Sequence, residues 1–93
     1  MLFAERIKIA REKKNIPQKM LAETLGIDVP MYSRIERGER PAKRDQVIAI
    51  AKKLSIDEKE LIYLWLAEKV LNIVSEEDDV NAVLNIVSSN IEK

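Results

Sequence analysis

The side chains of this 93-residue chain that are best suited to chemistry are cationic, and they gather in one short stretch. Arg37, Arg40, Lys43 and Arg44 lie within eight positions, and Arg34 precedes them by about one helical turn. Guanidinium and ammonium groups bind phosphate oxygens, and an arginine also reads guanine in the major groove of DNA. The stretch therefore predicts contact with a polyanion. The alternatives are a solvated run of charge and, for Arg34, a surface salt bridge.

Composition excludes most other chemistry. The chain contains no cysteine and no histidine, which removes disulfides, the usual zinc sites, and Cys–His or Ser–His catalysis. It also offers no nucleophile–base pair and no phosphate-binding loop, so we expect neither an enzyme nor a cofactor or metal site. The lack of cysteine fits a reducing, cytoplasmic compartment. We expect no signal peptide, because residues 1–14 are charged throughout, and no membrane span, because Glu68 and Lys69 interrupt the longest apolar stretch.

The net charge of zero hides a division along the chain. Residues 1–54 hold thirteen Lys and Arg against seven Asp and Glu, a net charge of +6. Residues 55–93 hold three against nine, a net charge of −6. Such segregation predicts a basic half that meets a polyanion and an acidic half with another task. A chance imbalance between solvated faces is the alternative.

Apolar spacing and helix-end signals predict six helices, at residues 2–14, 17–25, 30–37, 44–54, 57–74 and 75–91. Asn15, Gly26 and Gly38 are expected to end the first three helices in the left-handed conformation. Pro30 is favoured as the first residue of the third helix, since the residue before a proline avoids the helical region. Ser75 is expected to begin the sixth helix with an acidic residue three positions later.

The second and third helices have the dimensions of a helix-turn-helix. Seven residues stand in the spacing Q-x3-A-x3-G-x6-S-x-[IL]-E-x-G, namely Gln18, Ala22, Gly26, Ser33, Ile35, Glu36 and Gly38. The set resembles the lambda-repressor/Cro-type helix-turn-helix family, also called the xenobiotic-response-element type, over about residues 4–64. The resemblance implies an all-α fold with a five-helix lambda-repressor-like DNA-binding domain at residues 1–64. An additional C-terminal helix then lies in an extension at residues 65–93.

The resemblance also implies that the third helix enters the major groove of double-stranded DNA. The positions expected to contact bases hold Val29, Pro30, Met31 and Arg34. The first three lack the donors and acceptors for bidentate contacts and can only touch a thymine methyl, so discrimination is expected mainly from Arg34. Tyr32 is expected to be half-buried, with its hydroxyl free for a phosphate. The expected phosphate contacts are Gln18, Tyr32, Ser33, Arg37, Arg40, Lys43 and Arg44.

One buried ion pair is implied by the same resemblance. In the family, the glutamate at the end of the third helix pairs with an arginine of the first helix. Glu36 and Arg11 stand at these positions. Such a pair fixes geometry more than it adds stability.

The acidic half carries more apolar surface than one small domain can cover. Residues 61–74 are apolar nearly all round, and the last helix adds a second apolar stripe. The hexamer VLNIVS occurs at residues 70–75 and again at 83–88. We expect a homodimer across a twofold axis, and the alternative is that the last helix folds back within one chain. The expected interface residues are Leu64, Trp65, Val70, Leu71, Val74, Val83, Leu84 and Val87.

Together these observations predict a transcriptional regulator that binds a pseudo-palindromic operator as a homodimer. No separate sensor domain is evident, so no small-molecule effector is expected. The size and the C-terminal helices resemble the controller proteins of bacterial restriction–modification systems. Two alternatives stay open: an antitoxin whose acidic helices cover a basic toxin, and a protein-interaction module that has lost DNA binding, since the Val-Pro-Met start of the third helix reads bases weakly.

Overall fold

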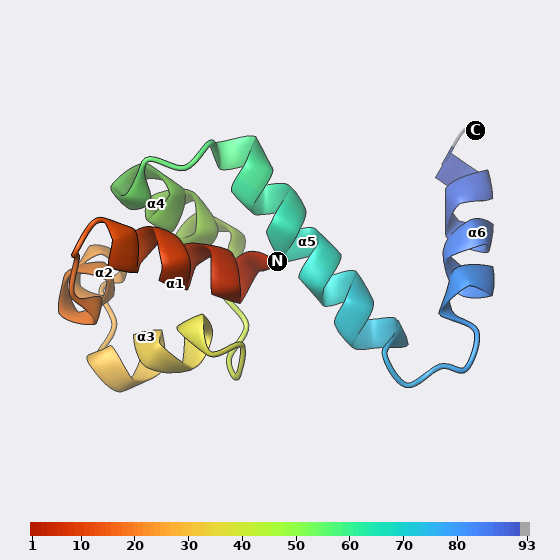
Figure 1. Ribbon diagram of the computed structural model, residues 1–93, viewed down its shortest axis with the longest axis horizontal. Coiled ribbons are helices and arrows are strands. Elements are labelled where there is room, and N and C mark those ends of the chain that lie inside the picture. Colours follow the sequence, from red (N-terminus) through yellow and green to blue (C-terminus); the bar gives the residue numbers. More distant parts are fainter. Residues whose placement is uncertain (92–93) are drawn as a thin grey trace.

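The computed structural model describes residues 1–91 and consists of six α-helices joined by short loops (Figure 1). The helices are α1 (Phe3–Lys13), α2 (Gln18–Leu25), α3 (Val29–Glu36), α4 (Arg44–Leu54), α5 (Glu58–Val74) and α6 (Val80–Ile91). No strand occurs among these residues. The predicted all-α fold, with five helices followed by one more, is confirmed. None of the described helices combines the length and the apolar character needed to cross a membrane.

The first five helices share one core, which we call the body of the molecule. α1 packs on α3, α4 and α5, while α2 packs on α3 and α4, and α4 packs on α5. Every one of these helices contributes apolar side chains that are almost fully buried. The largest of them are Ile7, Leu21, Tyr32, Ile35, Val47, Ile50, Leu54 and Leu61.

Four helices end with the same hydrogen-bonding pattern, in which a left-handed residue turns the chain. At the end of α2, the N–H of Gly26 (φ +68°) donates to Glu23 and the N–H of Ile27 donates to Ala22. Gly38 (φ +76°) ends α3 in the same way. Asn15 follows α1 and Ser55 follows α4, both with positive φ. The left-handed caps predicted at residues 15, 26 and 38 are confirmed, and the cap at residue 55 was not predicted.

Five helices begin at the predicted residue or one residue from it, and α6 begins five residues later than predicted. α3 starts at Val29, one residue before Pro30. The N-cap is Asp28, whose carboxylate accepts a hydrogen bond from the N–H of Met31 at 2.8 Å. The prediction that α6 begins at Ser75 was wrong. Ser75 is instead the C-cap of α5. The helix starts at residue 80, where the preceding carboxylate, Asp79, accepts a bond from the N–H of Ala82 at 3.0 Å.

Trp65 belongs to the body and not to a dimer interface, contrary to the prediction. Its side chain is 7% exposed, and its indole N–H donates a hydrogen bond to the carbonyl of Ala42 at 3.0 Å. Beyond Trp65, α5 runs out of the body, and α6 stands apart from it after a loop (Figure 1). The molecule is therefore elongated, with extents of 41 × 26 × 22 Å. The fold-back of α6 along α5, the alternative considered above, is not the arrangement of this chain.

Candidate nucleic-acid interface

α3 presents one side to the body and the other to solvent. Tyr32, Ile35 and Glu36 are buried against the body, which fixes the rotation of the helix. Val29 is 38% exposed, and Pro30 and Arg34 are also exposed, whereas Met31 and Ser33 are partly buried. The residues predicted to contact bases thus lie on the outer side of α3 or at its edge.

The guanidinium of Arg34 makes no side-chain hydrogen bond or ion pair within the part of the chain that the structure describes. It lies on the exposed side of α3, in the second turn of the helix. An arginine whose five donors are unoccupied can form the bidentate bond with guanine that reads a base pair. The alternative, in which Arg34 forms a surface salt bridge, does not occur among these residues.

Arg37 differs from Arg34, because acidic and hydroxyl partners already hold its guanidinium. It donates to both carboxylate oxygens of Glu39, at 3.0 and 3.1 Å, and to the hydroxyl of Ser33 at 2.7 Å. The hydrogen bonds with Glu39 raise the pKa of Arg37, and those with Arg37 lower the pKa of Glu39. Two predicted phosphate contacts, Ser33 and Arg37, are therefore tied to each other. The sequence analysis missed Glu39, whose signal was its place two residues after Arg37.

A buried ion pair anchors α3 to α1 and to the start of α2. Arg11 donates to both oxygens of Glu36, at 2.9 and 2.8 Å, and to the carbonyl of Ile16 at 2.8 Å. The amide of Gln18 adds a bond to Glu36 at 3.2 Å. Burial alone would raise the pKa of Glu36, but hydrogen bonding, chiefly from Arg11, outweighs burial and lowers this pKa. The pair sets how far α3 projects from the body.

Tyr32 corrects the predicted interface. Its side chain is fully buried, not half-buried, and its hydroxyl has no hydrogen-bond partner of ordinary geometry. Burial raises the pKa of the phenol, and the neighbouring Glu36 carboxylate raises it further. A hydroxyl inside the core is out of reach of a DNA phosphate. The aromatic ring at this position is part of the core.

The segment between α3 and α4 carries the remaining predicted phosphate contacts. Arg40, Lys43 and Arg44 are all exposed. The N–H of Lys43 donates to the side chain of Gln46 at 2.9 Å. Lys43 and Arg44 thus stand at the N-terminus of α4, where the helix dipole itself favours an anion.

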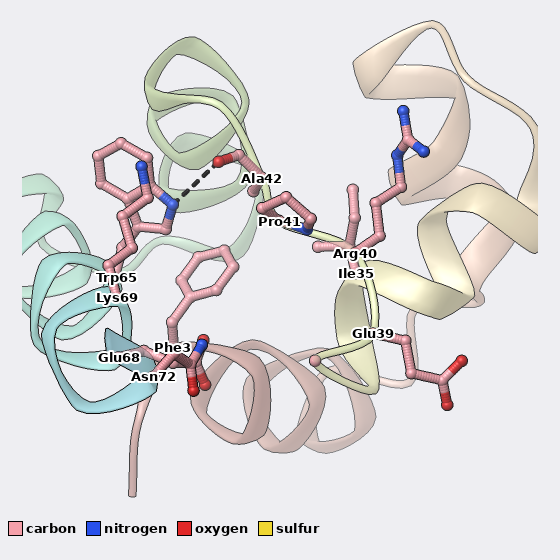
Figure 2. Close-up of a pocket in the computed structure, with 11 residues that line it drawn as sticks. Phe3, Ile35, Glu39, Arg40, Pro41, Ala42, Trp65, Glu68, Lys69 and Asn72 are labelled. Atoms are coloured by element: carbon pink, nitrogen blue, oxygen red, sulfur yellow. Dashed lines mark hydrogen bonds between the residues drawn. The ribbon is translucent and has the colours of Figure 1, made fainter. Parts of the chain in front are cut away.

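Trp65 holds this connecting segment in place. The guanidinium of Arg44 lies 5.6 Å from the centroid of the indole ring, and the ammonium of Lys69 lies 3.9 Å from it. Figure 2 shows the indole bonded to the Ala42 carbonyl, where both residues line a pocket of about 250 Å³ that Phe3 also lines. This bond ties the segment between α3 and α4 to α5 two residues before Arg44.

The comparisons with known proteins agree with this geometry. The chain matches the family model described as "Helix-turn-helix" over residues 7–61, which is more than half of its length. The chain belongs to this helix-turn-helix family, of the lambda-repressor-like or xenobiotic-response-element type, and its domain is that of a DNA-binding regulator. The search of curated proteins and the search of solved structures found no match.

Proposed function

We propose that this protein is a cytoplasmic transcriptional regulator that recognises a pseudo-palindromic operator as a homodimer. The observation that carries the proposal is the exposed side of α3, with the unoccupied guanidinium of Arg34 on a helix that the Arg11–Glu36 pair holds rigidly. Helices of this type lie in the major groove and read bases with residues near their N-terminus. Two copies related by a twofold axis then read two inverted half-sites.

The side chains divide the work between specificity and affinity. Arg34 bonds a guanine, while Val29, Pro30 and Met31 pack against the groove and its thymine methyls. Phosphates are bound by Gln18, Arg40, Lys43 and Arg44, and also by Ser33 and Arg37 once Arg37 exchanges Glu39 for a phosphate. Exposed ion pairs contribute little stability, so this exchange is easy. Tyr32 takes no part except as a core residue.

Selection of bound sequences from a random duplex pool tests the proposal. We expect one motif repeated in inverted orientation, with half-site centres about 10 base pairs, or a multiple of that, apart. The Arg34→Ala variant, selected in parallel, is expected to lose one base preference in each half-site. Binding of all duplexes without enrichment would contradict sequence-specific recognition. Absence of any salt-dependent binding would favour the interaction module that has lost DNA binding.

Two narrower functions rest on the C-terminal region. Control of restriction–modification genes is supported only by the presence of the C-terminal helices α5 and α6. It is tested by whether the selected motif precedes the gene of this chain and an endonuclease gene. An antitoxin role is supported by α6, which has no buried residue in this chain, and by the four acidic residues before it. A basic protein that co-purifies in stoichiometric amount would establish that role.

A further inference from the structure

We infer that two copies of the chain exchange their C-terminal helices, so that α6 of each protomer packs on α5 of the other. The inference rests on the homodimer of the proposed function and assigns its surface. It concerns the side of α5 that faces away from the body, which we call the back of α5. The back of α5 consists of the exposed residues Tyr63, Leu66, Ala67, Val70, Leu71 and Ile73. Val74, on the same side at the end of the helix, is already buried within the chain.

α6 is too short and too exposed to be stable as a free helix. None of its twelve residues is buried, and none of them is charged. An isolated helix of this length is marginal in water even when its sequence favours helix formation. Its apolar stripe follows helical spacing, from Val80 through Val83, Leu84 and Val87 to Ile91. Val87 is 52% and Ile91 70% exposed, so the stripe needs a covering surface outside its own helix.

The back of α5 is such a surface. The opposite side buries Leu61, Ile62 and Trp65 in the body, and it also carries Glu68 and Lys69, which line the pocket of Figure 2. Within residues 61–74, no charged residue lies on the back; Lys59 and Glu60 reach this side only in the first turn of α5. At about 100° per residue, the residues of the back spread over about 160° of the helix, whereas a helix packed on one neighbour buries a stripe of about 100°. The back of α5 therefore has room for two neighbouring helices, α5 and α6 of a second copy.

The chain exposes more surface than a compact monomer of its mass, and the excess is close to the area that one protomer buries in a stable dimer. The accessible surface is 6425 Å². A compact monomer of the same mass, 10.7 kDa, exposes about 5,500 Å². The excess is therefore about 900 Å², and a standard interface buries about 800 Å² on each partner.

The segment before α6 favours exchange over fold-back. Residues 76–79 are four consecutive carboxylates, which repel one another and extend the chain. The structure accordingly holds α6 away from its own α5 (Figure 1). An arm held out in this way can reach a second copy, and exchange of an identical element between protomers is a low-cost route to a dimer. The hexamer VLNIVS, present in both α5 and α6, gives the two helices similar apolar faces.

Engineered cysteines test the exchange directly, because the chain has no cysteine of its own. An affinity-tagged Val70→Cys chain is mixed with an untagged Val87→Cys chain, equilibrated in mild denaturant, returned to buffer and treated with a short bis-maleimide. We expect a crosslinked product that contains one tagged and one untagged chain. The control replaces Val70→Cys by Lys52→Cys, an exposed site on α4, and is expected to give no such product. Leu71→Cys with Leu84→Cys is a second pair if the first impairs folding.

The double variant Val70→Cys/Val87→Cys separates exchange from fold-back. Exchange gives products of dimer size on a denaturing gel, whereas products of monomer size alone would overturn the inference. If such a chain still sediments as a dimer and selects inverted half-sites, the proposed function stands and only the exchange fails. Wild-type chain that sediments as a monomer at high concentration would overturn both the exchange and the homodimer.

Discussion

At the residue scale, the clearest division is between cations that are held by the protein and cations that are open to a ligand. Arg11 is held by a buried carboxylate and Arg37 by an exposed one, while Arg34 is open. The three share a side-chain type and differ only in what surrounds them. We therefore propose separate roles for them: anchoring α3, modulating phosphate contact, and reading a base.

Replacing Glu36 by Gln is expected to lower the free energy of unfolding near pH 7 by about 3 kcal/mol, because it leaves the largely buried Arg11 without its anionic partner. The pKa of Glu36 is lowered in the folded state from an ordinary value of 4.5. Its contribution is thus full above about pH 4.5 and is lost as the pH falls through the folded-state pKa. Urea titrations of the wild type and Glu36→Gln at several pH values should show that the difference between their free energies of unfolding narrows as the pH falls.

Glu12→Gln is the matched control for this variant, since Glu12 lies 4.0 Å from Arg11 but is 56% exposed. It is expected to change stability little. Equal stability of Glu36→Gln and the wild type at pH 7 would contradict the anchoring role of the pair.

The Arg34→Ala and Arg44→Ala variants are expected to fail in different ways. Loss of Arg34 should weaken binding to the selected operator by about 1–3 kcal/mol and flatten the preference at one base pair per half-site. Loss of Arg44 should weaken binding to all duplexes alike and reduce the salt slope by about 1 per protomer. Fluorescence anisotropy over a salt series measures both. Equal losses on every sequence for Arg34→Ala would make Arg34 another phosphate contact.

Glu39→Gln is expected to strengthen binding to operator and random DNA alike. The change frees the guanidinium of Arg37 from its ion pair and removes a carboxylate from the end of α3. The same anisotropy titrations measure the effect, with Glu58→Gln on α5 as a control that also removes one negative charge. Unchanged or weaker binding would mean that Glu39 orients Arg37 for its phosphate and does not compete with it.

At the scale of the elements, helix ends decide where α3 and α4 point. The left-handed residues at positions 26 and 38 are glycines, which adopt positive φ without steric cost. Ser55 adopts φ +56° at the end of α4 without that advantage. Trp65 then fixes the path between α3 and α4 through its bond to Ala42. The positions of Lys43 and Arg44 are thus set by α5 and not by local sequence alone.

Ser55→Gly is expected to raise the free energy of unfolding by about 0.5–1 kcal/mol, since it relieves the left-handed strain and Ser55 is exposed. Ser75→Gly is the matched control, because Ser75 also ends a helix but has φ −61°. The control is expected to be neutral or destabilising. Urea titration of both variants gives the comparison, and a destabilised Ser55→Gly would contradict the assigned strain.

At the scale of the whole molecule, the body and the C-terminal helices differ in how far one chain buries their apolar side chains. The body buries its core within one chain, whereas the back of α5 and much of α6 stay exposed in that chain. If the proposed homodimer forms through these helices, we expect binding to two half-sites to depend on residues far from α3.

Val70→Asp is expected to weaken the dimer, because it places a charge in the middle of the back of α5. Asn72→Asp adds the same charge two residues away, on the side that lines the pocket, and serves as the control. Sedimentation equilibrium should show dissociation of the first variant only, with helix content retained by circular dichroism. The Val70→Asp variant should also bind a duplex with two half-sites more weakly than the wild type does. A Val70→Asp chain that remains a dimer would place the interface elsewhere.

The sequence by itself determined the features that depend on neighbours along the chain. Apolar spacing predicted all six helices, and Asn15, Gly26 and Gly38 predicted their ends, because backbone conformation at a turn is a local property. The family resemblance, carried by seven residues, predicted the helix-turn-helix. It also implied the partnership of Arg11 with Glu36, which are 25 positions apart.

Only the tertiary structure decided which side chains are covered and by what. Periodicity shows that Tyr32, Trp65 and Val70 lie on apolar sides of helices, but burial depends on where other helices pass. The body covers the first two and leaves Val70 43% exposed. Likewise, a run of arginines shows the sign of the charge but not its partner, so the engagement of Arg37 by Glu39 and the freedom of Arg34 emerged only when the chain was folded.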